Sequence, residues 1–317
     1  MAAQHIVVLD NWCPPPQVDF SHRLTLYDST TAEQLPDRIK DANMVITSNS
    51  RITRAGIEVA LHLRLIASNA TGTNHIDKAA ASERGITVCH VPGQNTDSVA
   101  EHAFALYYAL KRKVLTMHEL TMDGTTWSTG AAFKHLGEPP RTNAEETLVV
   151  IGYGAIGKKI QSIGIALGMR VLVAERKDNP DVRDGRVAFG QAFQEGTVFM
   201  AAAPLDATTQ GMVGSPEFES MLNTALLVNV GRSGIIDERA LIDALRAGQL
   251  GGAATDVFET EPATKENCLL LDRSIPNLVL SPHVAWYSSR TLKGTVATME
   301  ANLEAFVAGT PINVVSQ

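Results

Sequence analysis

A glycine-rich turn is the first segment of this sequence whose residue types and spacing suit chemistry. The residues GYGAIG at 152–157 directly follow an apolar run at 147–151 and precede a helical pattern at 158–167. In such a strand–turn–helix unit the first glycine makes a tight turn, the second lets a pyrophosphate approach the backbone, and the third lets the helix pack on the strand. The N-terminal N–H groups of the helix then face the phosphates. The segment predicts a dinucleotide-binding turn; the alternative is a turn without a ligand.

An acidic residue follows at the position that discriminates between dinucleotides. The apolar run 171–174 ends before Glu175, about 20 residues beyond the glycines, where a carboxylate can accept hydrogen bonds from the adenosine ribose hydroxyls. Its charge would repel a 2′-phosphate, which favours NAD as cofactor. Arg176 and Lys177 follow directly and could pair with such a phosphate, so NADP stays open. A glutamate at the surface without a ligand is the alternative.

A histidine beyond another apolar run is a candidate proton carrier. His283 follows the run 278–280 and Pro282, which places it at the carboxyl edge of a parallel sheet, where such sheets bind ligands. Histidine is the usual general acid or base near neutral pH. Taken alone, a hydrogen-bonded loop histidine is the more common explanation.

The elements that must position these residues form two series of alternating strands and helices, which predicts an α/β fold built of parallel βαβ units. Fully apolar runs suit strands that are buried on both faces. We expect helices at 32–40 and 76–84, one long helix at 96–120 that bridges into a second domain, a loop at 122–141, and a last helix at 289–308 that folds back on the first domain. We expect strands at 5–9, 44–47, 65–67, 86–88, 147–151, 171–174, 198–201, 226–230, 252–255 and 278–280.

Length and composition limit the classes of protein that fit. A chain of 317 residues predicts two domains. The net charge is −7 and Lys and Arg are scattered, which argues against a nucleic-acid or membrane partner. The three cysteines lie far apart without metal-ligand spacing, so we expect no metal site and a reducing cytoplasm. No segment looks like a signal peptide or a membrane span.

Three downstream segments resemble the signature segments of the D-isomer-specific 2-hydroxyacid dehydrogenases. They are NVGRSG at 229–234, DVFETEP at 256–262 and SPHVAW at 281–286, in the family's order. Two segments of the first part, TGTNHID at 71–77 and VPGQNTDSVAE at 91–101, agree as well. The resemblance covers essentially the whole chain, and it is specific to the family rather than to one member.

The resemblance implies two Rossmann-like domains with parallel sheets and an active site between them. A flavodoxin-like substrate domain would comprise 1–101 and 287–317, and a dinucleotide-binding domain would comprise 102–286. The helix after Thr96 matches the family's crossing helix. The family also suggests a homodimer.

The implied activity is transfer of a hydride between NAD(H) and the 2-position of a small D-2-hydroxy acid or 2-oxo acid. His283 would exchange a proton with the substrate oxygen, Glu261 would bond the other imidazole nitrogen, and Arg232 would bind the substrate carboxylate. Thr71 and Gly72 match the loop whose backbone amides hold that carboxylate. Alone, Arg232 could form a surface ion pair and Glu261 could be a solvated turn residue; occurring together with the glycine-rich turn, they favour catalysis.

Together, the glycine-rich turn and the resemblance place the dinucleotide contacts on many loops, with Asp256 near the nicotinamide carboxamide. The expected contacts are Thr96, Gly152, Gly154, Ala155, Ile156, Gly157, Glu175, Arg176, Thr209, Val230, Gly231 and Asp256. Two segments depart from the family pattern. NAEET at 143–147 replaces a common Leu-x-Gly-Lys-Thr stretch, which should alter only packing or dimer contacts, and AAA at 201–203 stands where a histidine is common.

The substrate and even the class of function stay open at this point. The segment 281–286 resembles that of glycerate dehydrogenases and hydroxypyruvate reductases, which favours glyoxylate, hydroxypyruvate or a similar acid. The segment 285–288 also resembles the C-terminal-binding co-repressors, so the alternative is a dinucleotide-sensing scaffold with little turnover. The long disordered tail of those co-repressors is missing here, which favours the enzyme.

Overall fold

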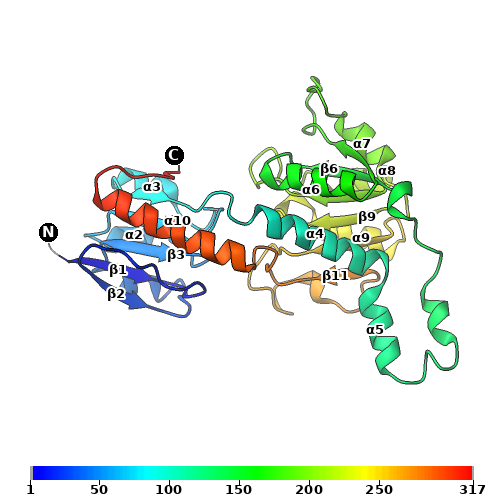
Figure 1. Ribbon diagram of the computed structural model, residues 1–317, viewed down its shortest axis with the longest axis horizontal. Helices are drawn as coiled ribbons and strands as arrows, with labels where there is room; N and C mark the ends of the chain where they lie inside the picture. Colours follow the sequence, from blue (N-terminus) through cyan, green and yellow to red (C-terminus); the bar gives the residue numbers. More distant parts are fainter. Residues whose placement is uncertain (1–2, 316–317) are drawn as a thin grey trace. The chain divides into compact units, whose positions relative to one another are not determined.

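The computed structural model describes residues 3–315 and divides the chain into two compact units (Figure 1). The first unit comprises Met1–Asn95 and Tyr287–Gln317, and the second comprises Thr96–Trp286. Each has one parallel sheet, so the prediction of two α/β domains with parallel sheets is confirmed. Among the described residues, no helix is long and apolar enough to cross a membrane.

The first unit has the strand order β2-β1-β3-β4-β5, the flavodoxin-like arrangement. Its strands are β1 (Gln4–Val8), β2 (His22–Leu26), β3 (Met44–Thr47), β4 (Leu65–Ser68) and β5 (Thr87–Cys89). Its helices are α1 (Leu35–Ile39), α2 (Arg54–Val59), α3 (Lys78–Glu83) and α10 (Ser289–Val307).

The sheet of the first unit is buried on both faces, as its apolar runs predict. Val45 of β3 packs in the core cluster formed with α1, α2 and α3. Its neighbours Met44 and Ile46 pack on the opposite face, where Met299 and Leu303 of α10 cover the sheet. The last helix therefore returns to the first unit, which confirms that prediction.

The second unit has the strand order β11-β10-β9-β8-β6-β7. A single bridge from Val187 to Ala174 extends it beyond β7, which gives the Rossmann order 3-2-1-4-5-6 with its third strand reduced to one residue and with β11 added as a seventh strand beside β10. Its strands are β6 (Thr147–Ile151), β7 (Arg170–Val173), β8 (Val198–Ala201), β9 (Leu226–Asn229), β10 (Gly252–Thr255) and β11 (Leu278–Leu280). Its α-helices are α4 (Thr96–Lys111), α5 (Val114–Met122), α6 (Ala155–Ala166), α7 (Phe189–Glu195), α8 (Ser215–Ser220) and α9 (Glu238–Arg246).

The sequence-based predictions need four corrections. The expected helix 96–120 is two helices, α4 and α5, because Lys113 adopts a left-handed conformation with φ of 49° and ends the run. The strand β2 was missed because it is a half-exposed edge strand whose residues are mostly polar or only partly buried. The helices expected at 32–40 and 76–84 shrink to α1 and α3. The loop expected at 122–141 contains one 3-10 turn, Ala131–His135.

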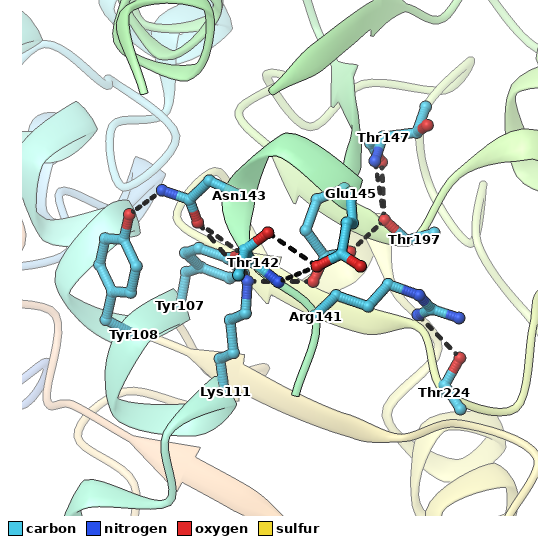
Figure 2. A network of polar contacts seen from close by, with 11 residues as sticks. Tyr107, Tyr108, Lys111, Arg141, Thr142, Asn143, Glu145, Thr147, Thr197 and Thr224 are labelled. Carbon is cyan, nitrogen blue, oxygen red and sulfur yellow. Dashed lines mark hydrogen bonds and ion pairs between the residues drawn. The ribbon is translucent and has the colours of Figure 1, made fainter. Parts of the chain in front are cut away.

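The segment that departs from the family pattern packs against α4 through a buried ion pair. The Lys111 ammonium lies 3.1 Å from a Glu146 carboxylate oxygen, and the two side chains are 4% and 5% exposed. Lys111 also donates to the Tyr107 hydroxyl at 2.6 Å, and the Thr197 hydroxyl donates to Glu146. Figure 2 shows Lys111 pointing into this network beside Tyr107 and Asn143. The pair ties the end of α4 to the amino edge of the sheet, opposite the edge that carries the candidate site.

Candidate active site

The glycine-rich turn joins β6 to α6 at the point where the strand order reverses between β6 and β8. Gly152 has φ of 90°, and a Cβ added there would lie 2.5 Å from the Ala203 backbone nitrogen. A Cβ on Gly157 would lie 2.0 Å from the Gly152 carbonyl oxygen. These two glycines are therefore required by the packing of the chain on itself.

Gly154 is not explained in this way. Its φ of −81° suits any residue, and a Cβ added there would meet no atom within 4 Å. The open space lies at the N-terminus of α6, where Ala155 and Ile156 supply the first backbone amides and no side chain caps the helix. Because Gly154 has no side chain and the first N–H groups of α6 have no side-chain cap, a pyrophosphate can approach the backbone closely here. The turn thus fits a dinucleotide.

An imidazole–carboxylate pair lies beyond β10 and β11 of the same sheet. His283 Nδ1 is 2.6 Å from a Glu261 carboxylate oxygen, and the other oxygen of Glu261 accepts from the Phe258 backbone N–H at 3.0 Å. An ionised carboxylate accepts hydrogen bonds and cannot donate them, so the proton between the two side chains is on Nδ1 of His283. The second ring nitrogen, Nε2, is left to exchange a proton with another molecule.

The loop that carries His283 is held in an unusual conformation. His283 has φ of 54°, in the left-handed region that few residues other than glycine adopt. Asp256, only 1% exposed, holds the loop on both sides of the histidine. Its carboxylate accepts hydrogen bonds from the Ser281 hydroxyl at 2.6 Å, the Val284 N–H at 3.0 Å and the Ala285 N–H at 2.8 Å.

His102 of α4 completes this cluster. Its Nε2 lies 2.9 Å from the Ser281 hydroxyl oxygen and 3.5 Å from Asp256. Burial opposes the charge of Asp256, but hydrogen bonds from His102, Ser281 and the loop amides outweigh it and lower the pKa of the carboxyl. Sequence reasoning missed His102 and Ser281, because spacing along the chain does not show that residues 179 positions apart are bonded. The position of Asp256 near the nicotinamide carboxamide stays a prediction, and its carboxylate accepts hydrogen bonds from Ser281, Val284 and Ala285.

Arg232 follows β9 in a turn that the Asn229 side chain holds. Asn229 accepts from the Gly231 N–H at 3.1 Å and donates to the Arg232 carbonyl at 3.0 Å. Burial lowers the pKa of the Arg232 guanidinium, and the nearby Glu261 charge opposes this effect. The charge of Glu261 thus acts on the guanidinium, and its carboxylate contacts the imidazole of His283. The structure brings the three predicted residues together at the carboxyl edge of one sheet.

The remaining predicted positions lie at several loops. Thr96 begins α4, and Val230 and Gly231 follow β9. Thr209 donates its hydroxyl to the Pro204 carbonyl at 2.7 Å, in the turn after β8. Glu175 and Arg176 follow β7, and Glu175 accepts a hydrogen bond from the Arg183 side chain. In the first unit, Thr71 and Gly72 lie in the loop after β4, where the Thr71 hydroxyl donates to the Val91 carbonyl at 2.9 Å.

A Rossmann sheet with a turn that fits a dinucleotide and an imidazole–carboxylate pair at the same edge suits a dinucleotide-dependent oxidoreductase. The family model described as "D-isomer specific 2-hydroxyacid dehydrogenase, NAD binding domain" matches residues 104–285. The chain belongs to the D-isomer-specific 2-hydroxyacid dehydrogenase family, and it is an NAD(P)-dependent oxidoreductase of hydroxy and oxo acids.

Curated relatives agree with this assignment, and a solved structure agrees with the fold. A glycerate dehydrogenase of Methylorubrum extorquens is 35% identical over 94% of this chain and 94% of its own. A hydroxypyruvate reductase of Blautia hydrogenotrophica is 30% identical over 98% of this chain and 99% of its own. An NAD-dependent formate dehydrogenase from Staphylococcus aureus, solved in complex with NAD, shares the fold with a TM-score of 0.84 at 23% identity, covering 99% of each chain.

Proposed function

We propose that this chain interconverts glyoxylate or hydroxypyruvate and the corresponding 2-hydroxy acid, with D stereochemistry where the product is chiral and with His283 as general acid and base. The observation that carries the proposal is the 2.6 Å contact between His283 and Glu261 at the edge where the dinucleotide turn lies. Glu261 fixes the proton on Nδ1, so Nε2 protonates the substrate oxygen during reduction and takes the proton back during oxidation. The bound nicotinamide supplies or accepts the hydride.

Arg232 is the proposed ligand of the substrate carboxylate. A guanidinium presents two parallel N–H groups that match a carboxylate, and the removal of water by burial strengthens such a pair. The partial burial of the Arg232 guanidinium supports this role. Backbone amides of Thr71 and Gly72 are proposed to bind the same carboxylate. The cofactor contacts proposed are Thr96, Gly152, Gly154, Ala155, Ile156, Gly157, Glu175, Arg176, Thr209, Val230, Gly231 and Asp256.

A panel of 2-oxo acids tests the proposed function. With NADH and with NADPH, we expect glyoxylate and hydroxypyruvate to be reduced at about 1 s⁻¹ or faster, measured as loss of absorbance of the reduced cofactor. In the reverse direction, D-glycerate should be oxidised and L-glycerate should not. A protein that binds the reduced cofactor but turns over no 2-oxo acid would instead support the scaffold hypothesis.

We propose a homodimer whose interface includes α5 and the segment that follows it. Figure 1 shows this part of the second unit extending away from its sheet, and α5 has no buried residue. Contiguous exposed apolar side chains mark protein interfaces, and the family suggests a second copy as the partner. The exposed large apolar residues of this arm are Val114, Leu115, Met122, Trp127, Phe133 and Leu136.

The oligomeric state tests the proposed interface. The wild-type chain should sediment at twice its chain mass, and Trp127→Asp combined with Phe133→Asp should shift it to the monomer, because charged side chains cannot be buried unpaired. Leu61→Asp is the control, since Leu61 is equally exposed but lies in the first unit. A wild-type monomer, or a dimer that the double variant leaves intact, would contradict the proposal.

The cytoplasm is the proposed location. Cys13, Cys89 and Cys268 are all free within the described part of the chain, which is usual in a reducing compartment. With Lys and Arg scattered along the sequence, the expected partners are the small acid and a second copy rather than nucleic acid or a membrane.

A further inference from the structure

Glu175 lies beside the dinucleotide turn. In the register of the sheet, Val150 of β6 pairs with Val173 of β7, and Ala174 donates its N–H to the Val150 carbonyl at 3.0 Å. Gly152 and Glu175 each lie two residues beyond this pair, at the carboxyl ends of adjacent strands. This is the place where an acidic residue can bind the adenosine ribose.

The carboxylate of Glu175 has no acceptor site left for a ribose. One oxygen accepts from the Arg176 N–H at 2.8 Å and from the Arg183 guanidinium. The other accepts from the Arg183 N–H at 3.1 Å and from Arg183 Nε at 2.8 Å. An ionised carboxylate offers about four lone-pair sites, and these four N–H groups fill them. The Arg183 guanidinium holds the pKa of Glu175 well below its usual range.

Arg183 covers this carboxylate from the solvent side. The Glu175 side chain is fully buried, whereas that of Arg183 is 46% exposed. The residues from Asp178 to Gly185 are mostly exposed, so few packing contacts hold this loop in place. Arg186 adds a second guanidinium 3.8 Å from Glu175 and 5.4 Å from the ring centre of Tyr153 in the glycine-rich turn.

Several charged side chains of this loop and its ends surround Glu175. Arg176, Arg183 and Arg186 oppose the single charge of Glu175. The loop also carries three acidic residues, which form no ion pair with these arginines among the residues that the structure describes: Asp178, Asp181 and Asp184. In the described part of the chain, the carboxylate that pairs with Arg183 and Arg186 is thus the one that would repel a 2′-phosphate.

We infer that Arg183 selects the dinucleotide, and that it lets this chain bind NADPH at least as tightly as NADH. The ribose of NADH must displace the Arg183 guanidinium to reach Glu175. The 2′-phosphate of NADPH can instead accept hydrogen bonds from Arg183 and its neighbours, while the charge of Glu175 stays compensated. The inference rests on the proposed binding of the dinucleotide at residues 152–157.

Titration of the protein with NADH and NADPH, followed by nicotinamide fluorescence without any 2-oxo acid, tests the inference. We expect Arg183→Ala to raise the ratio of the NADPH Kd to the NADH Kd by about 10- to 100-fold, the range of a charge-assisted hydrogen bond. The variant loses a phosphate ligand and leaves Glu175 free to accept from a ribose and to repel a phosphate. Arg170→Ala is the matched control: it removes the same charge from the opposite end of β7, where Arg170 pairs with Glu195, and should leave the ratio unchanged.

A second pair of variants keeps the test sound if Arg183→Ala folds poorly. Glu175→Gln removes the buried charge, and adding Arg183→Ala to that variant should still weaken NADPH binding by about tenfold or more. A wild-type protein that binds NADH more tightly than NADPH would overturn the inference, as would an unchanged ratio in Arg183→Ala. Absence of turnover would count only against the proposed function, because no substrate is present in these titrations.

Discussion

A His283→Ala variant is expected to lose about 10²- to 10⁴-fold in kcat, the usual contribution of a general acid or base, while its Kd for NADH changes by about twofold or less. The imidazole is proposed to act on the substrate oxygen through Nε2, whereas the dinucleotide turn lies at β6. Steady-state kinetics with hydroxypyruvate gives kcat, and fluorescence titration gives the Kd.

His62→Ala provides the control for this variant, because His62 is exposed in the first unit and should leave kcat unaltered. Glu261→Gln provides a second comparison: it keeps an acceptor oxygen for Nδ1 but removes the charge that stabilises the imidazolium, so kcat should fall while NADH still binds. If the kcat of His283→Ala stayed near the wild-type value, the proton would have to come from another group.

The sequence predicts most of the strands, and the positions of the three central residues after strands of one sheet, because these signals are local. Runs such as 198–201 are wholly apolar, so they are recognisable as strands buried on both faces. His283, Glu261 and Arg232 each lie in a short segment of distinctive residues just after a strand. In a parallel sheet the carboxyl ends of strands share one edge, which is why residues far apart in sequence come together there.

Other features depend on side-chain contacts that leave no local signal. The end of α4 has neither glycine nor proline; the left-handed Lys113 lies in a run of basic residues. His102, Ser281 and Asp256 form one cluster from three distant segments. Glu175 has the right residue type and position for a ribose, yet Arg183, eight residues later, covers it. Residue type alone therefore predicted the place of each group but not its partner.

The segment 143–147, which departs from the family pattern, also has a side-chain partner that the sequence does not predict, and this partner affects stability. Aligned on Thr147, Glu146 takes the place of the family's lysine, and the compensating charge comes from Lys111 of α4 at 3.1 Å. Burial, with the charge of Glu146 adding to it, raises the pKa of the Tyr107 hydroxyl that accepts from Lys111. The segment is held by a buried, hydrogen-bonded ion pair, whose loss should be costly.

Lys111→Met is expected to lower the free energy of unfolding of the second unit by about 3–5 kcal/mol, because it leaves the Glu146 carboxylate buried without its counter-charge. The double variant Lys111→Met with Glu146→Gln should recover most of this loss, since a neutral amide can still accept from the Thr197 hydroxyl. Urea unfolding with fluorescence or circular dichroism gives the midpoints and slopes. Lys159→Met is the control: its pair with Asp97 is partly exposed, so the loss should stay below about 1 kcal/mol. Equal losses in the Lys111 and Lys159 variants would show that burial does not make the Lys111–Glu146 pair special.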